Sequence, residues 1–333
     1  LGLSVSIPAL ALASSLVALG VSPVLAVINV ILGNVIVLIP IQLNSHVGTK
    51  YGIPYPIFAR MTFGNKGAKL STISRSIIGC GWTSIQSWVG GGALAALIGI
   101  AIPFFSDQSQ TISMPGNDNV MVGQLIGFAV FVLVCGWVAY NGMEKIKWVQ
   151  NISAPLLIVV ITGLIIWSIY TIYATGHSFM DVFRVGNNEA LIEQNGGFAY
   201  VYLAGLTANI AYWATMALNI PDFSKMAKSQ KDQFNGQLIG MPIPMAVCAI
   251  AGALFAQATT YAYGTASYDP TTVFFYMSNP LAVAVCAIGV IVATLTTCVA
   301  ANVVAPANGW SDLAPKKVSF KKGVIITIVI SIF

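Results

Sequence analysis

Residues 77–98 read IIGCGWTSIQSWVGGGALAALI, an uncharged stretch long enough to cross a lipid bilayer as a helix. Within it, Trp82 and Gln86 are four residues apart and therefore share one helix face. A glutamine amide is costly to bury in hydrocarbon unless its two donors and its carbonyl find partners. We therefore expect a lined cavity here, in which a planar, amide-containing ligand stacks on the ring and hydrogen-bonds to the amide.

The composition of the chain is typical of an integral membrane protein. Of its 333 residues, 57% are hydrophobic and 8% are charged, and the mean hydropathy is +0.82. A soluble domain carries about 25% charged residues. The chain starts inside an apolar stretch and not at Met, so we expect a fragment of a longer polytopic protein. The stretches of helix length predict membrane spans at 1–20, 24–43, 77–101, 121–140, 152–173, 198–220, 236–260 and 281–304, with a further one beginning at Gly323.

The basic residues predict the orientation of these spans. Of the fifteen Lys and Arg residues, only Arg184 falls in the set of loops that holds most of the acidic residues. All the others fall in the alternate loops, which the positive-inside rule assigns to the cytoplasm. The N-terminus is then cytoplasmic, in a multi-pass protein of the plasma membrane. The net charge of +5 follows from this topology and does not indicate a nucleic-acid partner.

The predicted spans contain no group suited to catalysis. No Asp, Glu, Lys, Arg or His lies at the centre of any span, and the five cysteines show no metal-ligand spacing. A membrane hydrolase needs a nucleophile with its base or a metal cluster, and a proton relay usually needs an intramembrane titratable group. We therefore expect neither an enzyme nor a bound cofactor.

Neutral polar residues gather instead in the span 281–304. Thr294, Thr296, Thr297 and Asn302 lie within nine residues of one another. One interpretation is that each hydroxyl bonds back to its own helix or to a neighbouring one. The other is that adjacent hydroxyls and freed carbonyls form an oxygen cage for a small cation.

Two further features are typical of transporters with interrupted helices. Pro8 lies inside the first span and is expected to remove an internal hydrogen bond, while span six ends at Pro221. Asn209 and Trp213 are again four residues apart on one face of span six. The residues alone leave open whether the buried carboxamides line a pocket or bond neighbouring helices together.

Four motifs, in order from Gly48 to Asn308, resemble those of the nucleobase–cation symporter-1 family, which includes carriers of cytosine, uracil, allantoin and hydantoins. They are GTKYGIPYPIFARMTFG at 48–64, GWTSIQ at 81–86, NIPDFSKMAKSQKDQ at 219–233 and AANVVAPAN at 300–308. The third is more similar to the allantoin and uracil members than to the hydantoin carrier. The resemblance implies an all-α, LeuT-like fold with two inverted five-helix repeats followed by two extra helices. It predicts one transporter domain over 1–333, with the first repeat at 1–174 (helices 1–5) and the second at 198–333 (helices 6 to part of 9).

The resemblance also implies a ligand that stacks between Trp82 and Trp213, with Gln86 and Asn302 reading its amide edge. Asn209 and Tyr212 complete the candidate pocket. Two departures affect the pocket wall: Ala211 and Tyr212 replace two glycines of the hydantoin carrier, and a first-helix glutamine of that carrier aligns near Ile7 and Pro8. In that sodium-coupled carrier, first-helix carbonyls and eighth-helix residues hold the cation. These positions match Ala293, Thr296 and Thr297, and fall near Leu3 and Ser6.

The sequence therefore predicts a secondary active transporter that imports a nucleobase or a cyclic ureide by cation symport and alternating access. We expect Na⁺ as the coupling ion, the lipid bilayer as surroundings and a monomer as the working state. Two alternatives remain at this point: a proton-coupled symporter of the same fold, and a membrane protein that binds the same ligand as a sensor without transporting it.

Overall fold

The computed structural model describes residue 4 and residues 6–107, 109–114, 117–267 and 280–332. The chain divides into two compact units. Unit 1 comprises Leu1, Leu3–Phe58 and Ile158–Pro270, and unit 2 comprises Gly2, Ala59–Leu157 and Thr271–Phe333. Each unit therefore takes segments from both of the repeats predicted at 1–174 and 198–333, and the compact units do not coincide with those repeats.

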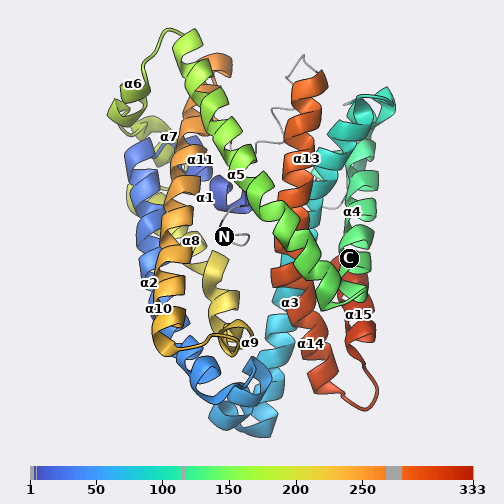
Figure 1. Cartoon of the computed structure of the whole chain (residues 1–333). Helices are drawn as coiled ribbons and strands as arrows, with labels where there is room; N and C mark the ends of the chain where they lie inside the picture. Colours follow the sequence, from blue (N-terminus) through green and yellow to red (C-terminus); the bar gives the residue numbers. More distant parts are fainter. Residues whose placement is uncertain (1–3, 5, 108, 115–116, 268–279, 333) are drawn as a thin grey trace. The chain divides into compact units, whose positions relative to one another are not determined.

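Unit 1 is built from long helices and several short ones (Figure 1). The long α5, Met143–Ala174, enters this unit with its C-terminal half, and α3, Tyr55–Gly99, begins here. The remaining helices are α1 (Ile7–Ala18), α2 (Pro23–Tyr51), α6 (Phe179–Arg184), α7 (Glu189–Gln194), α8 (Phe198–Asn219), α9 (Pro221–Ser224), α10 (Gln230–Gly240) and α11 (Pro242–Tyr263).

Local signals explain where the first two helices start and stop. The Ser6 hydroxyl accepts a hydrogen bond from the N–H of Ala9 and caps α1, while Ser22 caps α2 in the same way. Pro8 lies in the first turn of α1, where no internal bond is lost, so the loss expected there was wrong. The α2 helix ends at Gly52, whose φ of 66° is the left-handed conformation that glycine adopts most easily.

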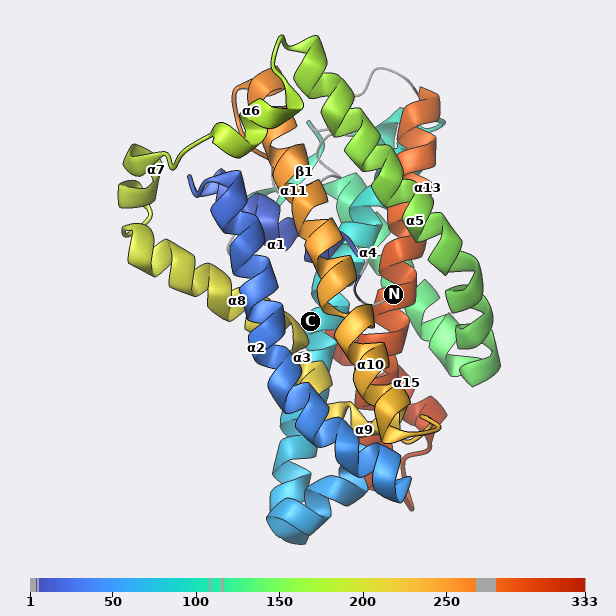
Figure 2. The same cartoon turned by 60° about the vertical axis from the view of Figure 1, so that its left-hand side comes forward.

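Close approaches between helices hold unit 1 together. A side chain at Gly252 of α11 would meet the backbone oxygen of Leu10 at 2.3 Å, so α1 packs directly on α11. A side chain at Gly33 would meet Asn209 at 2.5 Å, where α2 runs beside α8 (Figure 2). Small residues that let helix backbones approach closely are typical of helix packing in membranes.

Among the described residues, unit 2 holds most of α3, the start of α5, a 3₁₀ turn and five more helical segments. The α3 helix is interrupted at Gly64, where φ is 65° and ψ is 176°. After it come a short 3₁₀ turn at Pro103–Ser106 and a hairpin of β1 (Thr111–Met114) and antiparallel β2 (Asn117–Met121), which the all-α prediction did not include. The other segments are α4 (Val122–Tyr140), α13 (Pro280–Thr297), a π-helix (Cys298–Val303), α14 (Val304–Leu313) and α15 (Phe320–Ile332).

The core of unit 2 joins α4, the π-helix, α14 and α15. Its buried apolar side chains include Phe131 on α4, Val299 in the π-helix and Ile328 on α15. The α3 helix approaches α4 at consecutive glycines, since a side chain at Gly91 would meet the backbone nitrogen of Phe128 at 2.3 Å.

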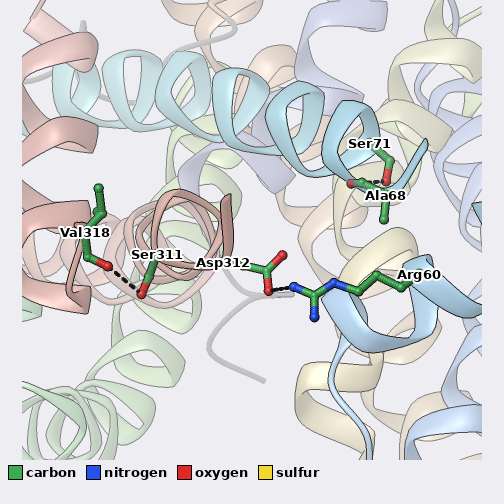
Figure 3. Close-up of polar contacts among 6 residues, drawn as sticks. All are labelled: Arg60, Ala68, Ser71, Ser311, Asp312 and Val318. Carbon is green, nitrogen blue, oxygen red and sulfur yellow. Dashed lines mark hydrogen bonds and ion pairs between the residues drawn. The ribbon is translucent and has the colours of Figure 1, made fainter. Parts of the chain in front are cut away.

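Two polar contacts lie at the end of unit 2 that holds the loop between α14 and α15 (Figure 3). Arg60, near the start of α3, forms an ion pair with Asp312 at the end of α14. Beside it, the Ser311 hydroxyl donates to the carbonyl of Val318 over 3.0 Å. The ion pair connects α14 to the first part of α3, which the span prediction had left outside the membrane helices, and the Ser311 bond holds the loop that follows α14.

Five helical stretches of the described residues are long and apolar enough to cross a membrane, in agreement with five of the predicted spans. Shorter apolar helices, Ile7–Ala18 and Ile158–Ala174, correspond to the predicted spans 1–20 and 152–173. The predicted span 77–101 lies in α3, and the span predicted from Gly323 lies in α15. The five long stretches are Pro23–Tyr51, Val122–Tyr140, Phe198–Asn219, Gln230–Tyr263 and Val283–Leu313.

Candidate ligand and cation site

The substrate residues predicted in unit 2 lie on α3 and in the π-helix. On α3, Gln86 is buried and Trp82 is half-buried. Gly79, one turn earlier, allows a close approach to α14, because a side chain there would meet Cγ of Pro306 at 2.4 Å. This approach brings Gln86 and Asn302 into contact.

Asn302 and Gln86 form a buried carboxamide pair. The amide nitrogen of Asn302 donates to Oε1 of Gln86 over 3.2 Å, and the exposed fractions of the two residues are 5% and 2%. This bond uses one donor of Asn302 and one lone pair of Gln86. Among the described residues no further bond is found for the Gln86 amide nitrogen or the Asn302 oxygen, so the pair has both a donor and an acceptor that a ligand edge could use.

The π-helix Cys298–Val303 carries Asn302 between α13 and α14, and all six of its residues are buried. A π-helical segment widens the helix by one residue per turn and releases backbone groups from their usual spacing. Such segments occur frequently at functional sites. Neither the composition nor the periodicity of the sequence predicted this one.

The eighth-span cation candidates lie in the last turns of α13. Ala293, Thr296 and Thr297 are all buried. The hydroxyl of Thr297 donates to the carbonyl of Ala293 over 3.0 Å, and that of Thr296 donates to the carbonyl of Val292 over 2.7 Å. Bonding back to the helix is the first of the two interpretations left open by the sequence. It does not exclude the second, because a hydroxyl that donates its proton keeps lone pairs for a cation.

In unit 1, Trp213 and Tyr212 occupy adjacent positions of α8. Trp213 is buried, and its indole nitrogen has no hydrogen-bond partner among the described residues. The Tyr212 ring meets the Trp213 ring edge-on, with centroids 5.4 Å apart and planes at 84°. The Tyr212 hydroxyl also lies 2.8 Å from the Ser6 hydroxyl, within hydrogen-bonding distance. Tyr212 thereby connects α8 to the N-terminal cap of α1.

Asn209 is engaged in packing between helices. Its amide nitrogen donates to Oδ1 of Asn29 on α2 over 2.8 Å and to the carbonyl of Gly205 over 2.9 Å. The residue is fully buried. These bonds connect α8 to α2, while the buried Oδ1 atom of Asn209 has no hydrogen-bond partner among the described residues, so its role in the pocket stays a prediction.

The remaining predicted combinations are not tested by these contacts. Trp82 and Trp213 lie in different units, as do Ser6 and Thr297, so both the stacking pair and the joint cation site stay predictions. Leu3 falls outside the described residues.

Two residues beside the carboxamide pair were missed by the sequence reading. The Arg75 guanidinium is buried and donates to the carbonyl of Ala301 over 2.9 Å. The Thr83 hydroxyl lies 3.0 Å from the carbonyl of Asn302 and 2.9 Å from that of Gly79 in its own helix, and shares its proton between them. Arg75 had been counted as a cytoplasmic loop charge, yet its spacing of eight residues from Thr83 and eleven from Gln86 places all three on one helix face.

A groove lies elsewhere in unit 1. It encloses about 720 Å³ between α2 and α10. Apolar side chains such as Leu38, Ile39 and Phe234 line it, together with Gln42, Gln233 and Lys231. None of the predicted site residues lines this groove.

The four motifs that carried the family resemblance contact one another in two pairs. In unit 1, Ser224 of the third motif donates to the carbonyl of Ser45, next to Gly48 of the first motif. The N–H of Tyr55 in the first motif donates to Asp222 in the third. In unit 2, Thr83 and Gln86 of the second motif contact Asn302 of the fourth.

Comparisons with known proteins agree with the family resemblance of these four motifs. A family model described as permease for cytosine/purines, uracil, thiamine and allantoin matches residues 1–333. The chain is 36% identical over 332 residues to a purine-uracil permease of Arabidopsis thaliana, covering 100% of the chain and 53% of that relative. It is 30% identical over 340 residues to an allantoin permease of Bacillus subtilis, covering 98% of the chain and 65% of that relative. The chain thus spans 53% and 65% of the length of these relatives.

Solved structures show the same fold. The inward-facing conformation of Mhp1 matches with a TM-score of 0.75 and 19% identity, over 99% of this chain and 67% of that one. Mhp1 is a nucleobase–cation–symport-1 family transporter, and its closed conformation with bromovinylhydantoin bound gives a TM-score of 0.73 at 18% identity, over 99% and 68% of the two chains. MhsT in complex with L-phenylalanine gives 0.73 at 16% identity, over 99% and 76%.

The predicted LeuT-like fold is confirmed by these matches, because Mhp1 and MhsT are LeuT-fold transporters. The relatives are permeases and not enzymes, as the sequence led us to expect. With its apolar helices and a family model that matches its whole length, this integral membrane chain belongs to the family of permeases for cytosine/purines, uracil, thiamine and allantoin.

Proposed function

We propose that the protein containing this chain imports a nucleobase or a cyclic ureide by symport with a cation, and that the cation is Na⁺. The observation that carries the proposal is the buried pair of Gln86 and Asn302. Family membership and the names of the purine-uracil and allantoin permeases support the same ligand class.

The chemistry of the pair suits a cyclic amide edge. Uracil, the oxopurines, hydantoin and allantoin each carry a ring N–H beside a carbonyl. The remaining donor of Gln86 and acceptor of Asn302 match these two groups in a buried setting, where an unpaired polar group is costly. A ligand without that edge would leave both amides unsatisfied, which is a strong basis for selectivity. Trp82 and Trp213 keep the stacking roles that the resemblance predicts.

For the cation, the oxygens of Ala293, Thr296 and Thr297 offer a neutral oxygen-only ligand set. Oxygen ligands are the type that hard cations prefer. Coupling requires that the cation bind one conformation of the transporter more tightly than the other, so that its binding favours the conformation that accepts substrate.

The setting of this activity is also part of the proposal. We place the protein in the plasma membrane with a cytoplasmic N-terminus, and expect it to work as a monomer that alternates between outward and inward access.

Uptake of labelled uracil and allantoin tests the proposal in cells or proteoliposomes that contain the full-length protein. Na⁺ is replaced by choline at fixed pH, and a pH gradient is then imposed without Na⁺; membranes without the protein give the background. We expect accumulation that requires Na⁺. Accumulation that ignores Na⁺ and follows the pH gradient would replace sodium coupling by proton coupling. Binding without accumulation would instead indicate a sensor.

A further inference from the structure

One face of α3 contacts the π-helix and the start of α14 at four positions. These positions are Arg75, Gly79, Thr83 and Gln86, spaced by four, four and three residues as on a single helix face. Gly79 sets the distance through its close approach to Pro306. The other three side chains make polar contacts with Ala301 and Asn302.

Two consecutive backbone carbonyls are the targets of this face. Arg75 donates to the carbonyl of Ala301 over 2.9 Å. The Thr83 hydroxyl shares its proton between the carbonyl of Asn302, at 3.0 Å, and that of Gly79 in its own helix, at 2.9 Å. The Cys298 thiol lies 3.9 Å from the carbonyl oxygen of Thr83, so the contact runs in both directions. The side chain of Asn302 then reaches Gln86 on the same α3 face.

Pro306 explains why one of these carbonyls needs a donor from another helix. In α-helical spacing the carbonyl of Asn302 bonds to the N–H of residue 306, and in π-helical spacing the carbonyl of Ala301 does so. Residue 306 is proline and has no N–H. Either spacing therefore leaves one of the two carbonyls without a donor from its own helix, and a buried carbonyl without a donor is costly.

We propose that Arg75 and Thr83 are positioning residues for ligand selectivity: by holding the carbonyls of Ala301 and Asn302, they fix the backbone from which the Asn302 side chain meets Gln86. The inference rests on the proposed function, since it assigns the residues that set the geometry of the same ligand site. Neither residue needs to touch the ligand. Loss of either residue should change the selectivity of the site among ligands more than it prevents ligand binding.

Thr83→Val tests the inference with little change of shape, because it exchanges the hydroxyl for a methyl group. Thr83→Ser keeps the hydroxyl. Thr327→Val on α15 is the matched control, since the buried Thr327 hydroxyl donates to the carbonyl of Gly323 in its own helix, over 2.9 Å, and the residue belongs to no predicted site. The full-length protein is assayed by competition of uracil, 1-methyluracil and 3-methyluracil against labelled substrate.

We expect Thr83→Val to weaken uracil binding about tenfold, as the loss of one buried hydrogen bond would. One of the two methylated compounds lacks the N–H that the Asn302 oxygen would accept, and its affinity should change much less. The ratio of the affinity for uracil to the affinity for that compound therefore falls. Thr83→Ser and Thr327→Val should keep the wild-type ratio. Arg75→Met, which keeps the length of the chain but has no donors, should lower the ratio in the same direction if it yields folded protein.

Two results would overturn the inference alone: a wild-type ratio in Thr83→Val, or an equal loss for all three compounds, which indicates a merely structural role. Failure of the wild-type protein to bind any of the panel, including labelled allantoin, would remove the proposed function as well. The proposed function and the inference therefore fail on different measurements.

Discussion

At the scale of single residues, we expect the two carboxamides and the two tryptophans to play different roles in ligand binding. The amides of Gln86 and Asn302 are buried and bonded to each other, so under the proposed function they should penalise ligands that lack a matching edge. The aromatic faces tolerate any flat ring. Affinity should therefore depend mainly on the tryptophans, and discrimination mainly on the amides.

Trp82→Ala and Trp213→Ala should each weaken ligand binding by roughly 5- to 150-fold, because stacking on an aromatic ring contributes about 1–3 kcal/mol per base. The measurement is equilibrium binding of labelled uracil or allantoin to the purified full-length protein. Trp137→Ala is the control, since Trp137 on α4 is 63% exposed and belongs to no predicted site. Unchanged binding in both site variants would rule out the stacking pocket.

Thr297→Ala should raise the Na⁺ concentration needed for half-maximal uptake, because the variant removes one candidate oxygen ligand from the last turn of α13. Thr297→Ser keeps the hydroxyl and should behave as wild type. Thr327→Ala controls for the loss of a hydroxyl that bonds back to its own helix. A Na⁺ dependence that is the same in all four proteins would remove Thr297 from the cation site.

At the scale of elements, glycine positions decide how closely α3 and α4 approach. A side chain at Gly91 would lie 2.3 Å from the nitrogen and 2.5 Å from Cα of Phe128, and a side chain at Gly127 would lie 2.2 Å from the carbonyl oxygen of Gly91. These are backbone atoms, so no rotamer change relieves the contact. The three consecutive glycines at 90–92 therefore fit a helix that packs backbone to backbone.

Gly91→Ala should lower the thermal unfolding midpoint of the purified protein, since overpacking of this kind costs about 1–3 kcal/mol. Gly163→Ala on α5 is the matched substitution, because a side chain there meets nothing within 4 Å. It should leave the midpoint unchanged or raise it, as Ala favours a helix interior over Gly by about 1 kcal/mol. Equal midpoints for the two variants would contradict the close approach of α3 and α4.

The apolar length of the helices could be predicted from the sequence, whereas their internal irregularities could not. Spans such as 121–140 and 198–220 match α4 and α8 almost residue by residue, because an apolar run needs only length to be recognised. The π-helix at Cys298–Val303 depends on donors supplied by Arg75 and Thr83 from a distant part of the chain. A local sequence pattern cannot predict a contact between two segments so far apart in the chain.

The same limit applies to the candidate site. The spacing of Trp82 and Gln86 indicated a ligand-facing helix, which stays a prediction, and the structure brings Gln86 into contact with Asn302. Asn209 shows an identical spacing to Trp213, yet its amide bonds to Asn29 on α2. A buried carboxamide four residues from a tryptophan is therefore an ambiguous signal, and only the neighbouring helix resolves it.

At the scale of the whole molecule, the distribution of charge predicts the topology. The loops that precede and follow α8 have opposite character: Glu189 and Glu193 lie in α7 before it, and Lys225 and Lys228 follow α9 after it. The positive-inside rule then places Lys228 in the cytoplasm and Glu189 outside.

Single cysteines at these two positions test the topology. In Glu189→Cys, a membrane-impermeant maleimide should label the protein in intact cells, whereas in Lys228→Cys it should label the protein only after permeabilisation. Both positions are exposed, and the native cysteines give a low background because four of the five are buried. Labelling in the reverse order would invert the predicted orientation.

The π-helix also sets a rule for insertions and deletions. Each residue removed from an α-helix rotates everything beyond it by about 100°. Shortening Cys298–Val303 by one residue would turn the segment into ordinary α-helix and rotate α14 as a whole. The close contact of Pro306 with Gly79 and the ion pair of Asp312 with Arg60 would then be lost. The eighth span should therefore tolerate many substitutions on its outer face but no change in its residue count, so its length is part of the information that the site requires.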